Sequence, residues 1–137
     1  MDKKYIIEWY NPQKTVLRVR YLGDVVWADV LAANMEALPM MQALLHDVIL
    51  LHDGGPYGID LPDIASVRNL FYAKIPPPPK NLKLAIAVMR SSNKNMLMMA
   101  MEALDKVIYG KKINYFVGSM EEADRLIAKA GLSGSKD

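Results

Sequence analysis

The sequence contains no cysteine among its 137 residues. Disulfides, thiol nucleophiles and thiolate metal sites are therefore excluded together. The only two histidines, His46 and His52, flank a candidate strand, and six residues of extended chain would separate them by roughly 20 Å. That distance excludes shared ligation of one metal ion by this pair, so we expect no metal site and no cofactor.

Long hydrophobic runs are also missing. No apolar stretch approaches the ~20 residues that a membrane-spanning helix needs, so we expect no membrane span. The segment Met1–Tyr5 lacks the apolar core of a secretory signal, which favours a cytoplasmic location. The formal net charge is only +2, and the lysines and arginines are scattered, so we expect no nucleic-acid partner.

Catalytic signatures are equally scarce. The sequence has no glycine-rich loop that would cradle a phosphate and no nucleophile elbow. Hydrophobic residues make up 52% and charged residues 23% of the chain, as in globular proteins. We expect residues 1–130 to form a single domain and the small, polar segment 131–137 to be a flexible tail.

Three short apolar runs recur along the chain in the same local context. Asp47–Leu51, Leu84–Met89 and Ile113–Val117 each precede turn-like residues and then a candidate helix. Two alternating segments before them, Tyr5–Tyr10 and Thr15–Leu22, read as an antiparallel hairpin. This order predicts an α/β fold with a mixed sheet of about five strands, an N-terminal antiparallel hairpin and helices packed on the sheet.

The helices have recognisable ends. Asp24 is the expected N-cap of a helix over Val25–Leu38, which Pro39 ends or kinks. A second long helix is expected over Lys94–Tyr109. The final helix starts with the capping box Ser119–Glu122 and reaches about Ala130.

The connections between these elements are expected to be less regular. His52–Gly58 reads as a long turn, because it contains three glycines and a proline. Pro62–Tyr72 reads as a short or weak helix. Pro76–Pro79 is interpreted as a stiff polyproline connection to the next strand.

Polar residues gather where the buried strands end. Asp53, Asp60 and Asp63 follow one strand, and Arg90 and Ser91 follow the next. The carboxyl ends of strands usually carry the ligand site of an open α/β sheet, so Arg90 and Ser91 are candidate ligand-binding residues. Short polar side chains also serve as turn and cap residues, and we assign no catalytic residue. An enzyme at this edge would need Asp53, Arg90 and Ser91 within reach of one reacting atom.

The segment His46–Asp53 also resembles the phosphoacceptor strand of response-regulator receiver domains, with Asp53 in the place of the acceptor. Those domains hold magnesium with an acidic pair after their first strand. Here Tyr5–Trp9 is followed by Tyr10, Asn11 and Pro12. The last strand ends in Val117–Ser119, where that family has a lysine, so this alternative lacks two of its parts.

Methionines mark a candidate partner surface on the Lys94–Tyr109 helix. At 100° per residue the charged side chains, including Glu102 and Asp105, fill one polar arc. Met98 falls inside that arc, and Met99 and Met101 lie on its margins. Because methionine adapts to irregular contacts, we expect a binding surface for a protein partner or a second copy of the chain, formed by Met98, Met99, Met101, Asp53, Tyr57, Asp60 and Asp63.

The assembled pattern resembles the SpoIIAA-like branch of the STAS superfamily, named for sulfate transporters and anti-sigma-factor antagonists. The similarity covers roughly residues 5–130. It depends on the hairpin, the Asp24-led helix, the strand Asp47–Leu51, the segment Gly58–Ile64 and the ending Phe116–Ala123.

The resemblance implies a regulatory or protein-binding domain that is not an enzyme. In the antagonist members a serine follows an Ile-Asp pair, and its phosphorylation controls binding to a kinase-like anti-sigma factor. Here Ile59 and Asp60 are followed by Leu61, so the phosphoacceptor hydroxyl is missing. Some relatives of this fold bind lipids, which makes an apolar or lipid-like ligand, held between helices and sheet, the alternative function.

Overall fold

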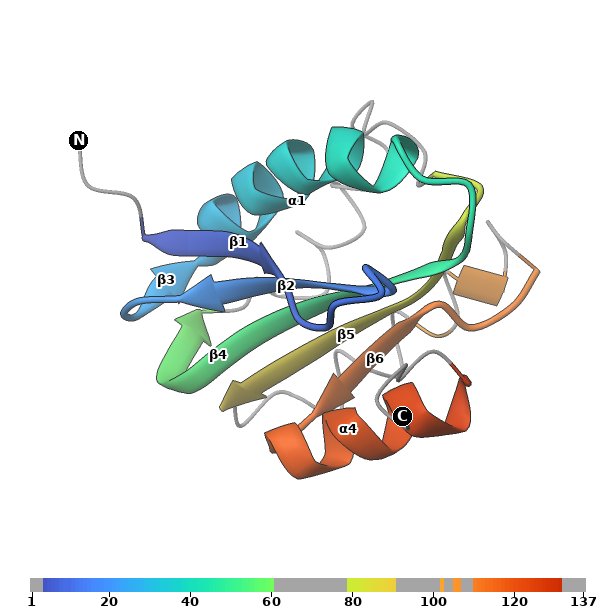
Figure 1. The fold of residues 1–137 in the computed structure, drawn as a ribbon. Coiled ribbons are helices and arrows are strands. Elements are labelled where there is room, and N and C mark those ends of the chain that lie inside the picture. The colour runs from blue at the N-terminus through green and yellow to red at the C-terminus, as the bar shows by residue number, and fades with distance from the viewer. Residues whose placement is uncertain (1–3, 61–78, 91–101, 103–104, 107–109, 132–137) are drawn as a thin grey trace.

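The computed structural model describes residues 4–60, 79–90, 102, 105–106 and 110–131. Its sheet has the strand order β1-β2-β4-β5-β6, with the short β3 paired to the end of β4. The hairpin β1–β2 is antiparallel and all other pairings are parallel. Among the described residues, helix α1 (Trp27–Gln42) covers one face of the sheet and helix α4 (Met120–Lys129) covers the other (Figure 1). The predicted α/β fold with a mixed sheet and an N-terminal hairpin is confirmed. The elements are β1 Tyr5–Trp9, β2 Val16–Tyr21, β3 Val25–Val26, α1 Trp27–Gln42, β4 Val48–Asp60, β5 Leu82–Arg90, β6 Asn114–Val117 and α4 Met120–Lys129.

The Asn11 side chain helps to close the hairpin turn. The Asn11 carboxamide oxygen accepts hydrogen bonds from the backbone N–H groups of Thr15 (3.0 Å) and Val16 (3.2 Å). Lys14 adopts a positive φ of 57° in the same turn. Asparagine is suited to this task because its short carboxamide can mimic a backbone acceptor.

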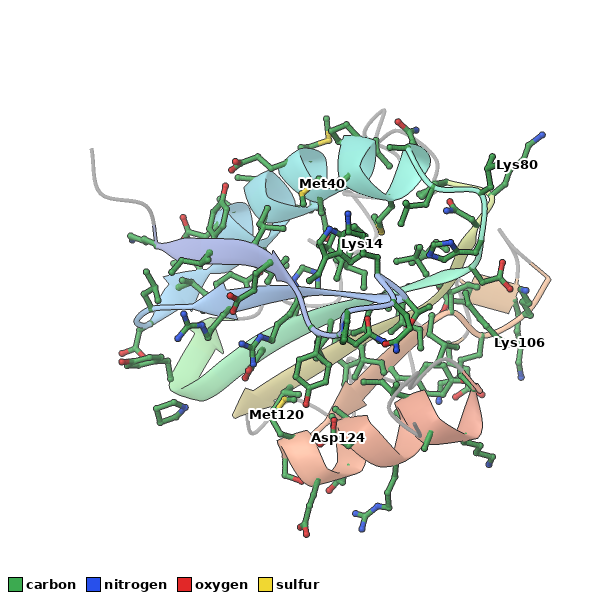
Figure 2. All side chains as sticks on the ribbon, viewed as in Figure 1. Lys14, Met40, Lys80, Lys106, Met120 and Asp124 are labelled. Carbon is green, nitrogen blue, oxygen red and sulfur yellow. The ribbon has the colours of Figure 1, made fainter. Side chains whose placement is uncertain are left out.

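Two apolar layers sandwich the sheet, and β4 contributes to both. Val48 and Leu50 pack with α1, whereas Ile49 and Leu51 pack with α4. A strand covered on both faces needs no polar alternation, which explains the unbroken apolar run seen in the sequence. In Figure 2, Met40 marks the α1 side and Met120 the α4 side.

Helix α1 differs from the prediction at both ends. Asp24 is not its N-cap: the cap is Val26, whose N–H donates to the Asp29 carboxylate at 3.0 Å. Val25 belongs to strand β3, because Ile59 offers it a parallel partner. The helix also continues through Pro39 and ends at Gln42, so Pro39 does not end it. An exposed proline costs the helix one backbone hydrogen bond without stopping it.

Strand β4 is much longer than predicted. The expected turn His52–Gly58 is wrong, since β4 runs on to Asp60. Its pairing with β5 shifts register between Asp53 and Gly58, where Gly55 adopts a positive φ of 54°. This irregularity contains the turn-forming residues, and β3 then supplies a new partner for the strand end.

The C-terminal elements follow the prediction closely. Strand β5 begins two residues before and ends one residue after its expected limits, and β6 begins one residue later than expected. The Ser119 hydroxyl accepts from the Glu122 N–H at 3.2 Å, while the Glu122 carboxylate accepts from Gly118 at 3.3 Å. No helix in the described part of the chain has the length and apolar character to cross a bilayer.

Several expectations fall on residues outside the described part. The weak helix Pro62–Tyr72 and most of the polyproline connection lie there. Of the helix Lys94–Tyr109, only Glu102, Asp105 and Lys106 are described, and all three are helical.

Candidate functional site

His52 and Asp53 sit side by side at the middle of β4, yet they serve opposite faces of the sheet. Successive side chains of a strand alternate in direction, so His52 joins the α1 side and Asp53 the α4 side. Both are nearly buried, with 6% and 7% of their surface exposed. One reacting atom therefore cannot contact both side chains.

His52 is held by two neutral partners. Its Nδ1 lies 2.8 Å from the Tyr21 hydroxyl, and its Nε2 lies 2.9 Å from the Asn34 carboxamide oxygen. Burial lowers the pKa of His52 from 6.5 to about 4 and raises the pKa of Tyr21 above its usual value. A neutral imidazole fits this geometry. Its Nδ1 accepts a hydrogen bond from the Tyr21 hydroxyl, and its Nε2–H donates one to the Asn34 carboxamide oxygen.

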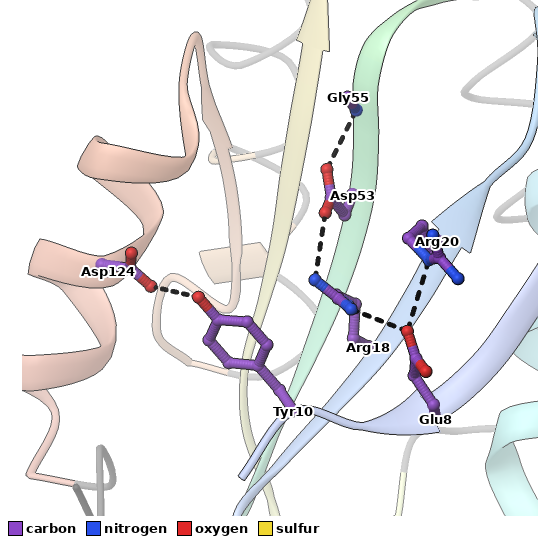
Figure 3. A network of polar contacts seen from close by, with 7 residues as sticks. All are labelled: Glu8, Tyr10, Arg18, Arg20, Asp53, Gly55 and Asp124. Atoms are coloured by element: carbon purple, nitrogen blue, oxygen red, sulfur yellow. Dashed lines mark hydrogen bonds and ion pairs between the residues drawn. The ribbon is translucent and has the colours of Figure 1, made fainter.

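Asp53 belongs to a charged network on the other face (Figure 3). Its carboxylate accepts from the Gly55 N–H at 2.9 Å and lies 3.6 Å from the Arg18 guanidinium. Arg18 donates in turn to Glu8 at 2.7 Å, and Glu8 lies 3.3 Å from Arg20. The hydrogen bond from Arg18 lowers the pKa of Glu8, and attraction to both arginines acts in the same direction.

Tyr10 extends this network from β1 to helix α4. The Arg18 guanidinium lies over its ring at 5.2 Å from the centroid, and its hydroxyl donates to Asp124 at 2.9 Å. Burial raises the pKa of Tyr10, as does its bond to Asp124. The network thus joins the hairpin, β4 and α4, and its two arginines and two strand carboxylates neutralise one another.

The network leaves a buried polar atom without a partner. In the part of the chain that the structure describes, Nε of Arg18 is buried and has no hydrogen-bond partner. The carboxylates of Glu8 and Asp53, the groups that could act as general bases, are engaged by guanidinium groups or by a backbone N–H. The network is therefore best suited to a structural role, in which it links the hairpin, β4 and α4.

An apolar patch lies at the carboxyl edge of the sheet. Leu22, Val26 and Tyr57 are exposed by 44%, 48% and 37%. Leu22 directly follows β2, Val26 is the second residue of β3, and Tyr57 precedes the β4 residues that pair with β3. We call these three residues the carboxyl-edge patch. They are three of the six large hydrophobic side chains that are exposed in the described structure.

The structure places the predicted site residues in different environments. Tyr57 is exposed, whereas Asp53 is buried. Asp60 ends β4 opposite Val26, and Arg90 ends β5 opposite Gly58. The remaining predicted site residues lie outside the described part of the chain: Asp63, Ser91, Met98, Met99 and Met101.

Asp105 departs from the polar arc that the sequence predicts. It is 0% exposed, and its carboxylate accepts from the backbone N–H groups of Ile113 and Asn114, each at 2.8 Å. The Asn114 carboxamide donates a third bond at 2.9 Å. Asp105 is thus a structural acceptor that fixes the start of β6, and it does not belong to a solvated surface.

Sequence reasoning missed Arg18, Arg20, Leu22 and Val26. The alternation of Arg18 and Arg20 with Leu17 and Val19 already indicated a polar sheet face, but not its partners. Among the described residues, no group of three or more acidic or histidine side chains is placed to hold a metal ion. No family model matches the chain, and neither does a curated protein or a solved structure.

Proposed function

We propose that this chain is a protein-binding regulatory module that works without catalysis, and that its partner docks on the carboxyl-edge patch. The observation that carries the proposal is the exposure of Leu22, Val26 and Tyr57 at the carboxyl edge of the sheet. Exposed apolar side chains that lie together are typical of interaction sites, and tyrosine is enriched in them.

The polar groups beside the patch support a binding role over a chemical one. His52 is buried, neutral and bonded on both ring nitrogens. Asp53 is engaged by Arg18 and by a backbone N–H. A general base must reach a substrate proton directly or through one water, and each of these side chains is already committed to another residue.

A rigid platform favours docking at this edge. The patch is carried by the pairing of β3 with the end of β4 and by the N-terminus of α1. Sites on regular elements lose little conformational entropy on binding. Because Leu61 follows Asp60 where the antagonists have serine, we propose binding that does not depend on a phosphorylated residue at that position.

The proposal is tested by affinity capture with matched variants. Purified chain and the double variant Val26→Thr/Tyr57→Gln are immobilised, exposed to lysate of the source cells, and compared by quantitative mass spectrometry. We expect a protein that the parent chain retains and the double variant loses by about tenfold or more, which corresponds to ~1.4 kcal/mol of binding free energy. Thr keeps the β propensity of Val, and both substituted side chains are exposed, so the double variant should fold like the parent chain.

The control variant is Met35→Gln on α1, since Met35 is also exposed, at 53%, but lies away from the patch. It should retain the same protein as the parent chain. Equal retention by all three proteins would overturn the docking site. Native mass spectrometry of the purified chain tests the alternative: a bound lipid-sized mass would favour an apolar-ligand carrier instead.

A further inference from the structure

Strand β1 forms one edge of the sheet. Its only strand neighbour in the described structure is β2 (Figure 1). Two backbone bonds fix the phase of this ladder: Tyr10 N–H to Val16 at 2.8 Å, and Leu22 N–H to Lys4 at 2.9 Å. Because bonded and non-bonded pairs alternate in an antiparallel ladder, the even-numbered residues of β1 bond to β2.

The odd-numbered residues of β1 therefore point their backbone groups outward. The N–H and C=O of Tyr5, Ile7 and Trp9 face away from β2, along the open edge. Such a row of groups is a template for another strand unless the edge is blunted. The strand sequence Tyr-Ile-Ile-Glu-Trp contains no proline, and the register with β2 shows no bulge.

The single charge on this strand offers little protection. Glu8 is drawn toward β2 by Arg18 at 2.7 Å and by Arg20 at 3.3 Å, so it lies over its own sheet and is largely neutralised. Ile6, on the same face, keeps 39% of its surface exposed. The edge is thus apolar, rich in β-forming residues and nearly uncharged.

We propose that β1 pairs with β1 of a second copy of this chain, antiparallel and centred on Ile6. A twofold axis at Ile6 sets this side chain against Ile6 of the second copy. It also sets Lys4 opposite Glu8 of the other chain, twice. Tyr5 and Ile7 of opposite chains then face each other and exchange backbone hydrogen bonds, which uses the outward groups of both.

The alternative register is less complementary. Centring the pair on Ile7 would place each exposed Ile6 against a Glu8 carboxylate and remove the opposition of Lys4 to Glu8. Cross-strand pairs of opposite charge and of β-branched residues each favour a sheet by ~0.2–1 kcal/mol. The Ile6-centred register has both kinds of pair, and both chains contribute equally, as twofold symmetry requires.

This proposal does not depend on the proposed docking function, because it uses a different edge of the sheet. It predicts a continuous sheet through two copies, with β1 of each at the centre. An interface of two short strands is small, so the dimer should be weak and should depend on protein concentration.

Cysteine cross-linking tests the register directly, because the chain has no cysteine of its own. Opposite residues in a non-hydrogen-bonded pair have Cα atoms about 4.5 Å apart, within the range that a disulfide spans. We expect Ile6→Cys to form a disulfide dimer about tenfold faster or more than Met35→Cys, at equal concentration and mild oxidation. Met35 is the matched control because it is exposed on α1.

Sedimentation velocity of the cysteine-free chain supplies the second measurement. We expect a concentration-dependent shift from monomer to dimer, which Lys4→Glu weakens by placing two carboxylates opposite each other. Asp29→Asn is its control, since Lys4 also lies 3.9 Å from Asp29 within the chain, and it should leave the dimer intact. A monomer at every concentration, or equal cross-linking rates for Ile6→Cys and Met35→Cys, would overturn the proposal.

Discussion

The Tyr21 hydroxyl and Nδ1 of His52 lie 2.8 Å apart, and their rings are nearly parallel at 17°. The pair joins β2 to β4 beneath α1, where Asn34 completes it. A buried imidazole with this pair of partners is stable only while it is neutral. The contact therefore makes the fold sensitive to acid.

The first prediction concerns the pH dependence of stability. His52 has a pKa of about 4 in the folded chain against 6.5 when unperturbed, so its contribution is complete above pH 6.5 and is lost as the pH falls toward 4. The loss should reach about 3 kcal/mol. Urea unfolding at pH 7 and pH 4 measures it, with His52→Gln as the reference that cannot titrate. An equal decrease in both proteins would contradict the assignment.

The second prediction addresses the ion pair of Arg18 and Asp53. Arg18→Met keeps the apolar stem but leaves the Asp53 carboxylate buried without its cation, and should cost about 2 kcal/mol of unfolding free energy. Adding Asp53→Asn should recover part of this loss, giving a coupling energy of roughly 1–2 kcal/mol. Strictly additive effects in the double-mutant cycle would argue against a direct interaction.

Arg20→Met provides the comparison for this cycle. The Arg20 side chain is 46% exposed, and its contact with Glu8 is accessible to water. Its removal should cost less than about 1 kcal/mol.

The third prediction concerns Asp105. Asp105→Ala leaves the N–H groups of Ile113 and Asn114 without their acceptor at a buried position and should destabilise the chain by about 2–4 kcal/mol. Asp105→Asn retains a carbonyl oxygen that accepts from both groups, so it should cost less. Lys106→Ala, at a side chain that is 66% exposed, should change stability by less than ~0.5 kcal/mol. A neutral Asp105→Ala would refute the structural role.

The fourth prediction is a stabilising change. Pro39 lies on the exposed side of α1 and lacks the N–H that would bond to Met35. Pro39→Ala should add this bond and improve helix propensity, raising the unfolding free energy by about 1–3 kcal/mol. Thermal denaturation followed by circular dichroism checks it. A lower midpoint would mean that the proline conformation is required for packing.

Local sequence patterns correctly predicted the features that are set by residues close by in the chain. The alternation in β1 and β2 and the Ser119 cap of α4 both depend on nearby residues. Those features reflect chain geometry and local hydrogen bonding, so a single sequence is enough to reveal them.

The predictions are wrong where pairing with a residue distant in the sequence determines the secondary structure. The segment after Asp53 looks like a turn, but β3 and β5 offer it strand partners that override the turn preference of its glycines. Aspartate is a common helix N-cap, but Val25 pairs with Ile59 in a strand, so the helix begins after Val26 and Asp24 does not cap it. Such contacts depend on sheet register, which local composition does not encode.

The candidate site was predictable only in outline. The period of a strand already implies that His52 and Asp53 point to opposite faces. Their partners depend on the β2–β4 register, in which Val19 lies opposite His52 and Arg20 opposite Asp53. The carboxyl-edge patch likewise exists because β3 pairs with the end of β4, which brings Val26 to the strand that carries Tyr57.

Site-specific photocrosslinking at Tyr57 tests the central claim most directly. A photoreactive phenylalanine analogue replaces Tyr57 in one preparation and Met35 in another, and both are irradiated in the cells that produce the chain. The proposed function predicts a discrete protein adduct at position 57 that is absent at position 35. The same adducts at both positions, or none at position 57, would contradict it.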